Sequence, residues 1–171
     1  MRLFYAIALW GLLDTLPLRR GFEGMRQLRW VDPDLIHITL NFLGEVDKKA
    51  CEEAVFRLAQ VASGHEPFTL EFASTGAFPE RGSPRVLWVG LSRESADRVS
   101  RLSRDLGNDR PSPHVTIARV KDVVQSDLVA QWRRVEPKWP DVPVERIQLV
   151  ESKLTPRGPV YSVVASESLR G

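Results

Sequence analysis

Cysteine is nearly absent from this chain of 171 residues, since Cys51 is the only one. A single cysteine excludes a disulfide bond within the chain and any zinc site built from several cysteines. Proteins of reducing compartments commonly lack disulfides. We therefore expect a cytoplasmic protein.

Long apolar runs are also missing. No stretch of eighteen or more apolar residues occurs, which excludes a transmembrane helix and gives no reason to expect a membrane partner. The run from Arg2 to Trp10 places a basic residue before apolar ones, as a signal peptide would. It contains Tyr5 and Trp10, however, and lacks a small-x-small cleavage site. This pattern favours a buried first strand.

The sequence has little excess charge and lacks the common nucleotide-binding signatures. The net charge is +2, and no basic run exceeds two residues, so a protein that coats nucleic acid in bulk is not indicated. The patterns G-x-x-x-x-G-K-[ST], G-x-G-x-x-G and G-x-S-x-G are all absent. Their absence argues against an ATP site, a dinucleotide site and a serine nucleophile. We expect no cofactor.

The chain does contain one short motif that occurs twice. Residues 37–40 read His-Ile-Thr-Leu, and residues 114–117 read His-Val-Thr-Ile. The whole chain has only three histidines and six threonines, so two copies of this spacing are improbable by chance. The duplicated motif is the strongest functional signal in the sequence.

Both copies lie in segments that read as strands, residues 36–43 and 114–120. Side chains alternate between the two faces of a strand. His37 and Thr39 are therefore expected on one face and their apolar neighbours on the other, and the same holds for His114 and Thr116. If the two strands lie side by side, two imidazoles with ordinary pKa values near 6.5 would flank one small substrate.

Two such imidazoles can perform general acid–base catalysis, and the threonine hydroxyls can donate to phosphoryl oxygens. This set fits an in-line displacement at phosphorus. Arg119 is a further candidate for binding the phosphate. Its odd spacing from His114 places it nominally on the opposite face, so only its length or a β-bulge would bring it to the site.

The sequence also bears on metal binding, on the third histidine and on three aromatic residues. Neither motif has a nearby acidic residue, so we expect no metal site. The third histidine, His65, lies in a loop that ends a helix and is expected to be structural. Phe42, Phe78 and Trp88 could stack on a base, but core packing is the favoured interpretation for all three.

The remaining pattern predicts an α+β fold of one domain, residues 1–171, made of two lobes. One helix is expected after the capping residue Asp47 and ends at Ser63-Gly64, and a second, capped by Ser92, is expected from Glu94 to Leu106. A third, short helix is expected within residues 122–135, and residues 11–24 are left as a loop or short helix. Further strands are expected at residues 2–10, 27–31, 68–72, 85–91, 144–154 and 159–165, with residues 76–79 as a break.

These residues resemble the two-histidine phosphoesterase superfamily, and most closely its RNA 2′,3′-cyclic phosphodiesterases, also called 2′-5′ RNA ligases. The resemblance rests on the paired H-x-T-x motifs and their flanks. It extends to the opening strand at residues 2–7, the Phe-Leu-Gly-Glu sequence at 42–45, the segments 76–79 and 85–90, the second motif through Arg119, and residues 152–161.

The resemblance implies a bilobal fold of pseudo-duplicated antiparallel sheets, with helices on the outer faces and a central cleft carrying both motifs. It implies metal-independent hydrolysis of RNA 2′,3′-cyclic phosphate ends to 2′-phosphomonoesters, and reversible 2′-5′ joining of tRNA halves. Carried over, His37 would be the proton donor and His114 the proton acceptor, while Thr39 and Thr116 would hold the phosphate. We expect the protein to act as a monomer.

Two alternatives stay open at this point. One is a module that binds RNA ends without turnover. The other is an enzyme that acts on small cyclic nucleotides or on ADP-ribose cyclic phosphate.

Overall fold

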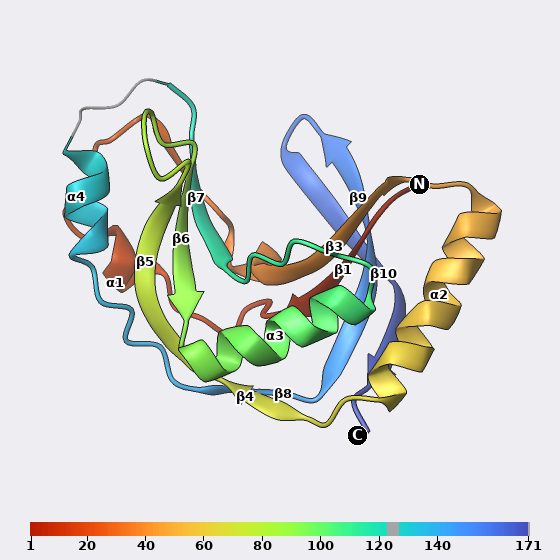
Figure 1. Cartoon of the computed structure of the whole chain (residues 1–171). Helices are drawn as coiled ribbons and strands as arrows, with labels where there is room; N and C mark the ends of the chain where they lie inside the picture. Colours follow the sequence, from red (N-terminus) through yellow and green to blue (C-terminus); the bar gives the residue numbers. More distant parts are fainter. Residues whose placement is uncertain (123–126, 171) are drawn as a thin grey trace.

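The computed structural model describes residues 1–122 and 127–170 of the chain (Figure 1). The strands are β1 (Arg2–Ala8), β2 (Leu28–Trp30), β3 (His37–Glu45), β4 (Phe68–Leu70), β5 (Phe72–Phe78), β6 (Val86–Leu91), β7 (Val115–Val120), β8 (Val142–Val144), β9 (Arg146–Thr155) and β10 (Gly158–Ser168). The helices are α1 (Leu16–Arg19), α2 (Lys48–Ser63), α3 (Arg93–Asp105) and α4 (Leu128–Arg133), with a short 3-10 helix η1 (Pro33–Leu35).

The strands form two four-stranded antiparallel sheets and one two-stranded sheet. The first large sheet has the order β10-β9-β1-β3 and the second has the order β2-β7-β6-β5. The two motif strands, β3 and β7, come from different sheets and contact each other. Figure 1 shows the first sheet on one side of the molecule and the second on the other, with α2 at the outer edge. The expected α+β fold with a duplicated antiparallel arrangement is confirmed.

The first strand is buried on both of its sides. Leu3, Tyr5 and Ile7 pack into the main core, whereas Phe4 and Ala6 belong to a second, smaller cluster. Both faces of β1 are therefore covered, one by the main core and the other by Val150, Trp10 and Tyr161, which explains why the strand is apolar after Arg2 rather than alternating. The expectation of a buried first strand is confirmed, although the strand ends at Ala8.

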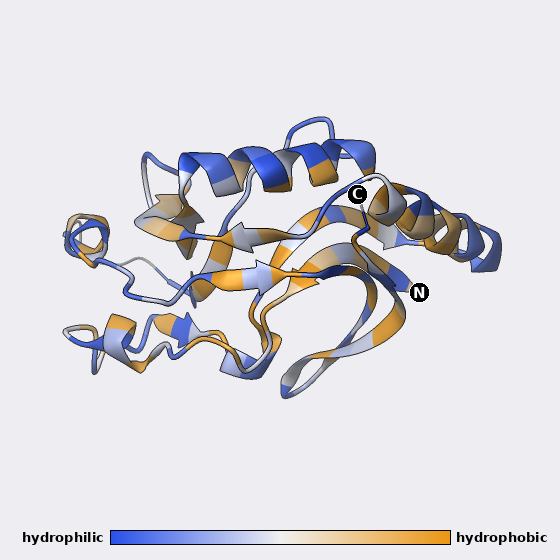
Figure 2. Cartoon of the chain, turned by 90° about the horizontal axis from the view of Figure 1, so that it is seen from below, coloured by the Kyte–Doolittle hydropathy of each residue, from blue (hydrophilic) through white to orange (hydrophobic). Residues whose placement is uncertain are grey.

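Both expected long helices are present and begin where their capping residues predict. The Asp47 carboxylate accepts from the N–H of Ala50 at 2.8 Å, and the Ser92 hydroxyl accepts from the N–H of Ser95 at 3.2 Å. Helix α2 packs against β9 and β10, and α3 packs against β3, β4 and β6. Hydrophilic residues dominate α3, while hydrophobic residues concentrate in the strands beneath it (Figure 2). The helices therefore cover the outer sides of the sheets.

Two predictions about the middle of the chain are wrong. Residues 68–72 do not form one strand, because β4 pairs with β8 in the small sheet and β5 begins separately at Phe72. Residues 76–79 do not interrupt the structure either, since β5 runs on to Phe78. Gly76 is Trp88's partner across the β5–β6 pair, and a Cβ atom at Gly76 would overlap the indole ring. Gly76 therefore leaves space for the Trp88 ring and does not mark a turn of the chain.

The short helix expected within residues 122–135 is α4, and part of that range, residues 123–126, lies outside the described residues. Strand β8 was not predicted. His65 is structural as expected, because its Nε2 atom lies 2.6 Å from the carboxylate of Asp105, joining the end of α2 to the end of α3. In the described part of the chain, no helix is long and apolar enough to cross a membrane.

Candidate active site

The two motifs are presented by alternation along their strands. Ile38 and Leu40 are fully buried in the main core, whereas His37 and Thr39 are half-buried on the other side of β3. Val115 and Ile117 are likewise buried beside a half-buried Thr116. His114 lies just before β7 begins. We call the side of each large sheet that carries a motif its motif side.

Hydrogen bonds fix the orientation of both imidazoles. The Nδ1 atom of His37 lies 2.8 Å from the carbonyl oxygen of Leu35, and Nδ1 of His114 lies 2.5 Å from that of Ser112. A carbonyl oxygen can only accept, so the proton of each neutral ring is on Nδ1. This leaves Nε2 of both rings for chemistry. Nε2 of His37 is 3.1 Å from the Thr39 hydroxyl.

The pKa values of both histidines are lowered from 6.5, mainly because burial disfavours the charged ring. The hydrogen bonds to Leu35 and Ser112 oppose this change. The positive charge of Arg119 lowers the pKa of each histidine further, and His114 adds to the effect on His37. These effects act between the two sheets, so the motif sides of the sheets face one another with both imidazoles within electrostatic reach.

A β-bulge brings Arg119 to the site. Along the β6–β7 pair, Leu87 is opposite Ala118 but Trp88 is opposite Thr116, so Ile117 is the extra residue. The bulge reverses the alternation, and Arg119 emerges on the motif side with His114 and Thr116. From the sequence, Arg119 could reach the site only through the length of its side chain or through a β-bulge, and the structure contains the bulge. Burial raises the pKa of Tyr161, across on the first sheet, and the charge of Arg119 opposes part of this rise.

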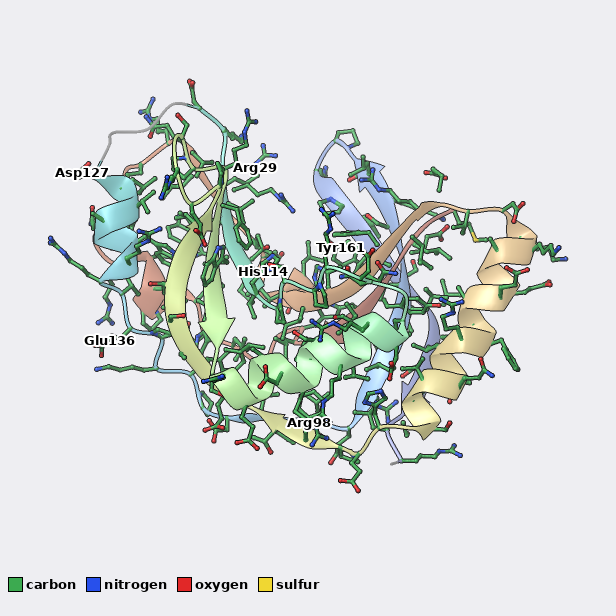
Figure 3. All side chains as sticks on the ribbon, viewed as in Figure 1. Arg29, Arg98, His114, Asp127, Glu136 and Tyr161 are labelled. Atoms are coloured by element: carbon green, nitrogen blue, oxygen red, sulfur yellow. The ribbon has the colours of Figure 1, made fainter. Side chains whose placement is uncertain are left out.

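Two aromatic residues beside His37 were not predicted as part of the site. The Phe4 ring centroid lies 5.1 Å from that of His37, and the Tyr161 ring meets His37 edge-on at 5.5 Å. These rings exclude water from one side of the imidazole and account for its burial. Burial also raises the pKa of Tyr161 above 10.0. Tyr161 and His114 project from the facing sides of the two sheets (Figure 3).

The second sheet supplies a matching aromatic wall. Phe78 meets His114 edge-on at 5.0 Å, and Trp88 lies 5.4 Å from Phe78 on the far side. Both rings are half-buried on the motif side rather than in the main core. Phe42 is 69% exposed and touches Phe4 at 5.9 Å. The core interpretation is therefore wrong for Phe42, and Phe78 and Trp88 form a small aromatic cluster beside His114 instead of joining the main core.

Two asparagines hold the first motif strand against the segment that leads to the second motif. The side-chain amide of Asn41 donates to the carbonyl oxygen of Leu106, and that of Asn108 donates to Leu40, both at 3.0 Å. These reciprocal bonds fix β3 relative to the end of α3. They help to set the separation of the two histidines, which sit in different sheets.

Within the described ranges, no three His, Cys, Asp or Glu side chains gather closely enough to hold a metal ion. The polar groups on the motif sides of β3 and β7 are two imidazoles, two hydroxyls and the guanidinium of Arg119. Such a set can bind a phosphate anion and move protons on two sides of it.

Comparison with known proteins agrees with this geometry. The family described as LigT like phosphoesterase matches the chain twice, at residues 15–88 and 89–161, so each copy contains one histidine motif. A curated Archaeoglobus fulgidus relative named RNA 2′,3′-cyclic phosphodiesterase is 33% identical, over 94% of this chain and 96% of its own length. Relatives of the same name from Thermus thermophilus and Aquifex aeolicus are 34% and 32% identical, over 100% and 84% of this chain and 91% and 82% of theirs.

Solved structures give the same result. A crystal structure of the Thermus thermophilus protein TT0787 has a TM-score of 0.78 at 31% identity, and the match covers 100% of this chain and 99% of that one. E. coli LigT complexed with 3′-AMP has a TM-score of 0.75 at 22% identity, over 99% and 98% of the two chains, which shows a shared fold. On its two family matches, its relatives and its fold, the chain belongs to the LigT-like phosphoesterase family.

Proposed function

We propose that this protein hydrolyses the 2′,3′-cyclic phosphate ends of RNA to 2′-phosphomonoesters. The observation that carries the proposal is the pair of imidazoles, His37 and His114, which come from two different sheets and both bond a backbone carbonyl through Nδ1, so that Nε2 is the atom left to exchange a proton with the substrate. The names of relatives that share most of this chain's length support the substrate.

We propose His114 as the proton acceptor and His37 as the proton donor, and the hydrogen bonds support this choice. Among the described residues, Nε2 of His114 has no protein hydrogen-bond partner, so its lone pair is available to take a proton from water. The water oxygen attacks phosphorus, the bond from phosphorus to the 3′ oxygen breaks, and His37 gives its Nε2 proton to that oxygen. The products are a free 3′ hydroxyl and a 2′-phosphomonoester, with the proton of the water on His114.

The remaining polar groups bind the phosphate. The hydroxyls of Thr39 and Thr116 lie beside the two imidazoles on the same strand faces, and each can donate to a phosphoryl oxygen. Arg119 adds a fixed positive charge that stabilises the negative charge of the transition state. The reaction needs no metal in this scheme, because the charge and both proton transfers are provided by side chains.

The same site supports a second outcome of the same step. If the 5′ hydroxyl of another RNA replaces water as the nucleophile, the cyclic phosphate opens to a 2′-5′ linkage, and the reaction is reversible because one phosphodiester replaces another. tRNA halves are the substrates that we propose for this joining reaction. We further propose that the chain works as a single two-lobed domain, as a monomer in the cytoplasm.

The test uses RNA with a 2′,3′-cyclic phosphate end, assayed in EDTA. We expect hydrolysis by the wild type and a loss of about 10²–10⁴-fold in kcat for His37→Ala and for His114→Ala, the range typical of general acid–base groups. His65→Ala is the matched control, because His65 pairs with Asp105 outside the site. Activity that survives both site substitutions would overturn the mechanism. Tight binding without turnover by the wild type would instead identify an RNA-end-binding module, and turnover of small cyclic phosphates alone would identify a small-substrate enzyme.

A further inference from the structure

Arg29 and Arg119 stand side by side at one end of the second sheet. They are Cα partners in the β2–β7 pair, so both side chains leave the sheet on the same side, the motif side. Beyond Arg119, the N–H of Lys121 donates to the carbonyl oxygen of Gln27 at 2.8 Å, which continues the same ladder. Alternation then places Lys121 on the motif side as well. We call Arg29, Arg119 and Lys121 the basic row.

The three side chains of the basic row have no counter-charge in an ion pair with any described residue. All three side chains are exposed, and in the described part of the chain none of them forms an ion pair. Like charges directly across a strand pair repel each other and destabilise a sheet. Two adjacent arginines without a carboxylate therefore indicate a site for anions that come from outside the protein.

The two arginines serve different anions. Arg119 is the arginine that faces the reacting phosphate of the proposed mechanism, because the β-bulge at Ile117 brings it to the motif side and its charge acts on His37 and His114. Arg29 lies one strand farther out, on the edge strand β2. Figure 3 places Arg29 well away from His114, toward the far end of β7. Its anion is therefore a neighbour of the reacting phosphate and not the same group.

A cyclic phosphate closes the 3′ end of an RNA, so the chain continues from it only in the 5′ direction. The neighbouring anion is then the first phosphodiester on the 5′ side. We propose that Arg29 binds this phosphodiester and that Lys121 lies along the path of the following one, so that the enzyme prefers an oligonucleotide to a mononucleotide. This inference rests on the proposed function. A nucleoside 2′,3′-cyclic phosphate lacks the group that Arg29 would bind.

The experiment compares three substrates with one enzyme. They are a nucleoside 2′,3′-cyclic phosphate, a trinucleotide ending in the same cyclic phosphate, and that trinucleotide with an uncharged methylphosphonate as its last linkage. For the wild type we expect kcat/KM to be about 10- to 100-fold higher for the charged trinucleotide than for the other two substrates. This is the range expected when one hydrogen bond between an arginine and a phosphate is gained. Arg29→Gln should remove this preference and leave the nucleoside substrate unaffected, and Arg29→Lys should retain part of it.

Arg20→Gln is the matched control, because Arg20 is an exposed arginine at the end of α1 and is not a member of the basic row. Equal kcat/KM for the charged and methylphosphonate trinucleotides in the wild type would overturn the inference while the proposed function stands. So would an equal loss in Arg29→Gln on the nucleoside and the trinucleotide. A wild type that hydrolyses none of the three substrates would overturn the proposed function itself, which makes the two failures distinguishable.

Discussion

The Nε2 atom of His37 lies 3.1 Å from the hydroxyl oxygen of Thr39, two residues farther along the same strand. A threonine hydroxyl can donate or accept. It can donate to the neutral ring and accept from the protonated one, and in the second case its own hydrogen is free for a phosphoryl oxygen. The pair thus links the protonation of His37 to the binding of the phosphate.

Replacing Thr39 by Val keeps the β-branched shape and removes the hydroxyl. We expect kcat/KM on RNA with a cyclic phosphate end to fall about 10- to 100-fold, because a hydrogen bond to a charged group contributes about 1.5–3 kcal/mol. Thr39→Ser should retain most of the activity. Thr69→Val, an exposed position on β4 outside the site, is the control. A Thr39→Val variant as active as the wild type would show that the hydroxyl does not touch the phosphate.

The dependence of rate on pH follows from the two lowered pKa values. In the free enzyme one imidazole must be neutral and the other protonated, so kcat/KM should follow a bell whose limbs belong to the coupled pair. Because burial lowers both pKa values below 6.5, the maximum should lie below pH 6.5, and kcat/KM should fall as pH rises through neutral. Steady-state kinetics from about pH 4.5 to about pH 8.5, a range that brackets an imidazole titration, measure this profile. A flat profile, or a maximum above neutral pH, would contradict the assignment.

A bound phosphate should raise both pKa values again. An anion close to an imidazole favours the protonated ring, opposing the effects of burial and of Arg119. The chain has only three histidines, so their ring C–H signals can be followed by NMR in a pH titration. We expect the His37 and His114 titrations to move to higher pH when inorganic phosphate is added. The His65 signals are the internal control, since His65 pairs with Asp105 outside the site.

The sequence predicted the two motif strands, the two long helices and the alternation that separates the motif residues from the core. It could do so because these are local patterns: apolar periodicity for the strands, and Asp47 and Ser92 as capping residues for the helices. The duplicated motif also implied that two distant segments meet. The contact between β3 and β7 shows that they do.

The parts that the sequence could not predict depend on pairing between strands. Arg119 reaches the site only because Ile117 forms a bulge, and nothing in the local pattern marks that position. Phe4 lies in a strand that is apolar on both sides, so its direction could not be read from alternation. Tyr161 reaches His37 through the long β9–β10 hairpin, whose register shifts between Val163 and Ala165. Each of these placements is set by a neighbour distant in the sequence.

Gly76 gives a last prediction, at a position where the sequence pattern was misread as a break. A Cβ atom there would overlap Cζ2 of Trp88, well inside any allowed contact. Gly76→Ala must therefore displace the indole, and overpacking of this kind costs about 1–3 kcal/mol. We expect a lower melting temperature, measured by circular dichroism. Activity should fall as well, because Trp88 packs on Phe78, which contacts His114.

Two further variants make the Gly76 prediction specific. Gly64→Ala is the control, because a Cβ atom at Gly64 would meet nothing closer than 3.7 Å and its backbone has no positive φ. Adding Trp88→Leu to Gly76→Ala removes the indole that causes the clash, so the double variant should be less destabilised than the sum of the two single changes. Strict additivity of the two free-energy changes would show that the glycine serves some purpose other than making room for Trp88.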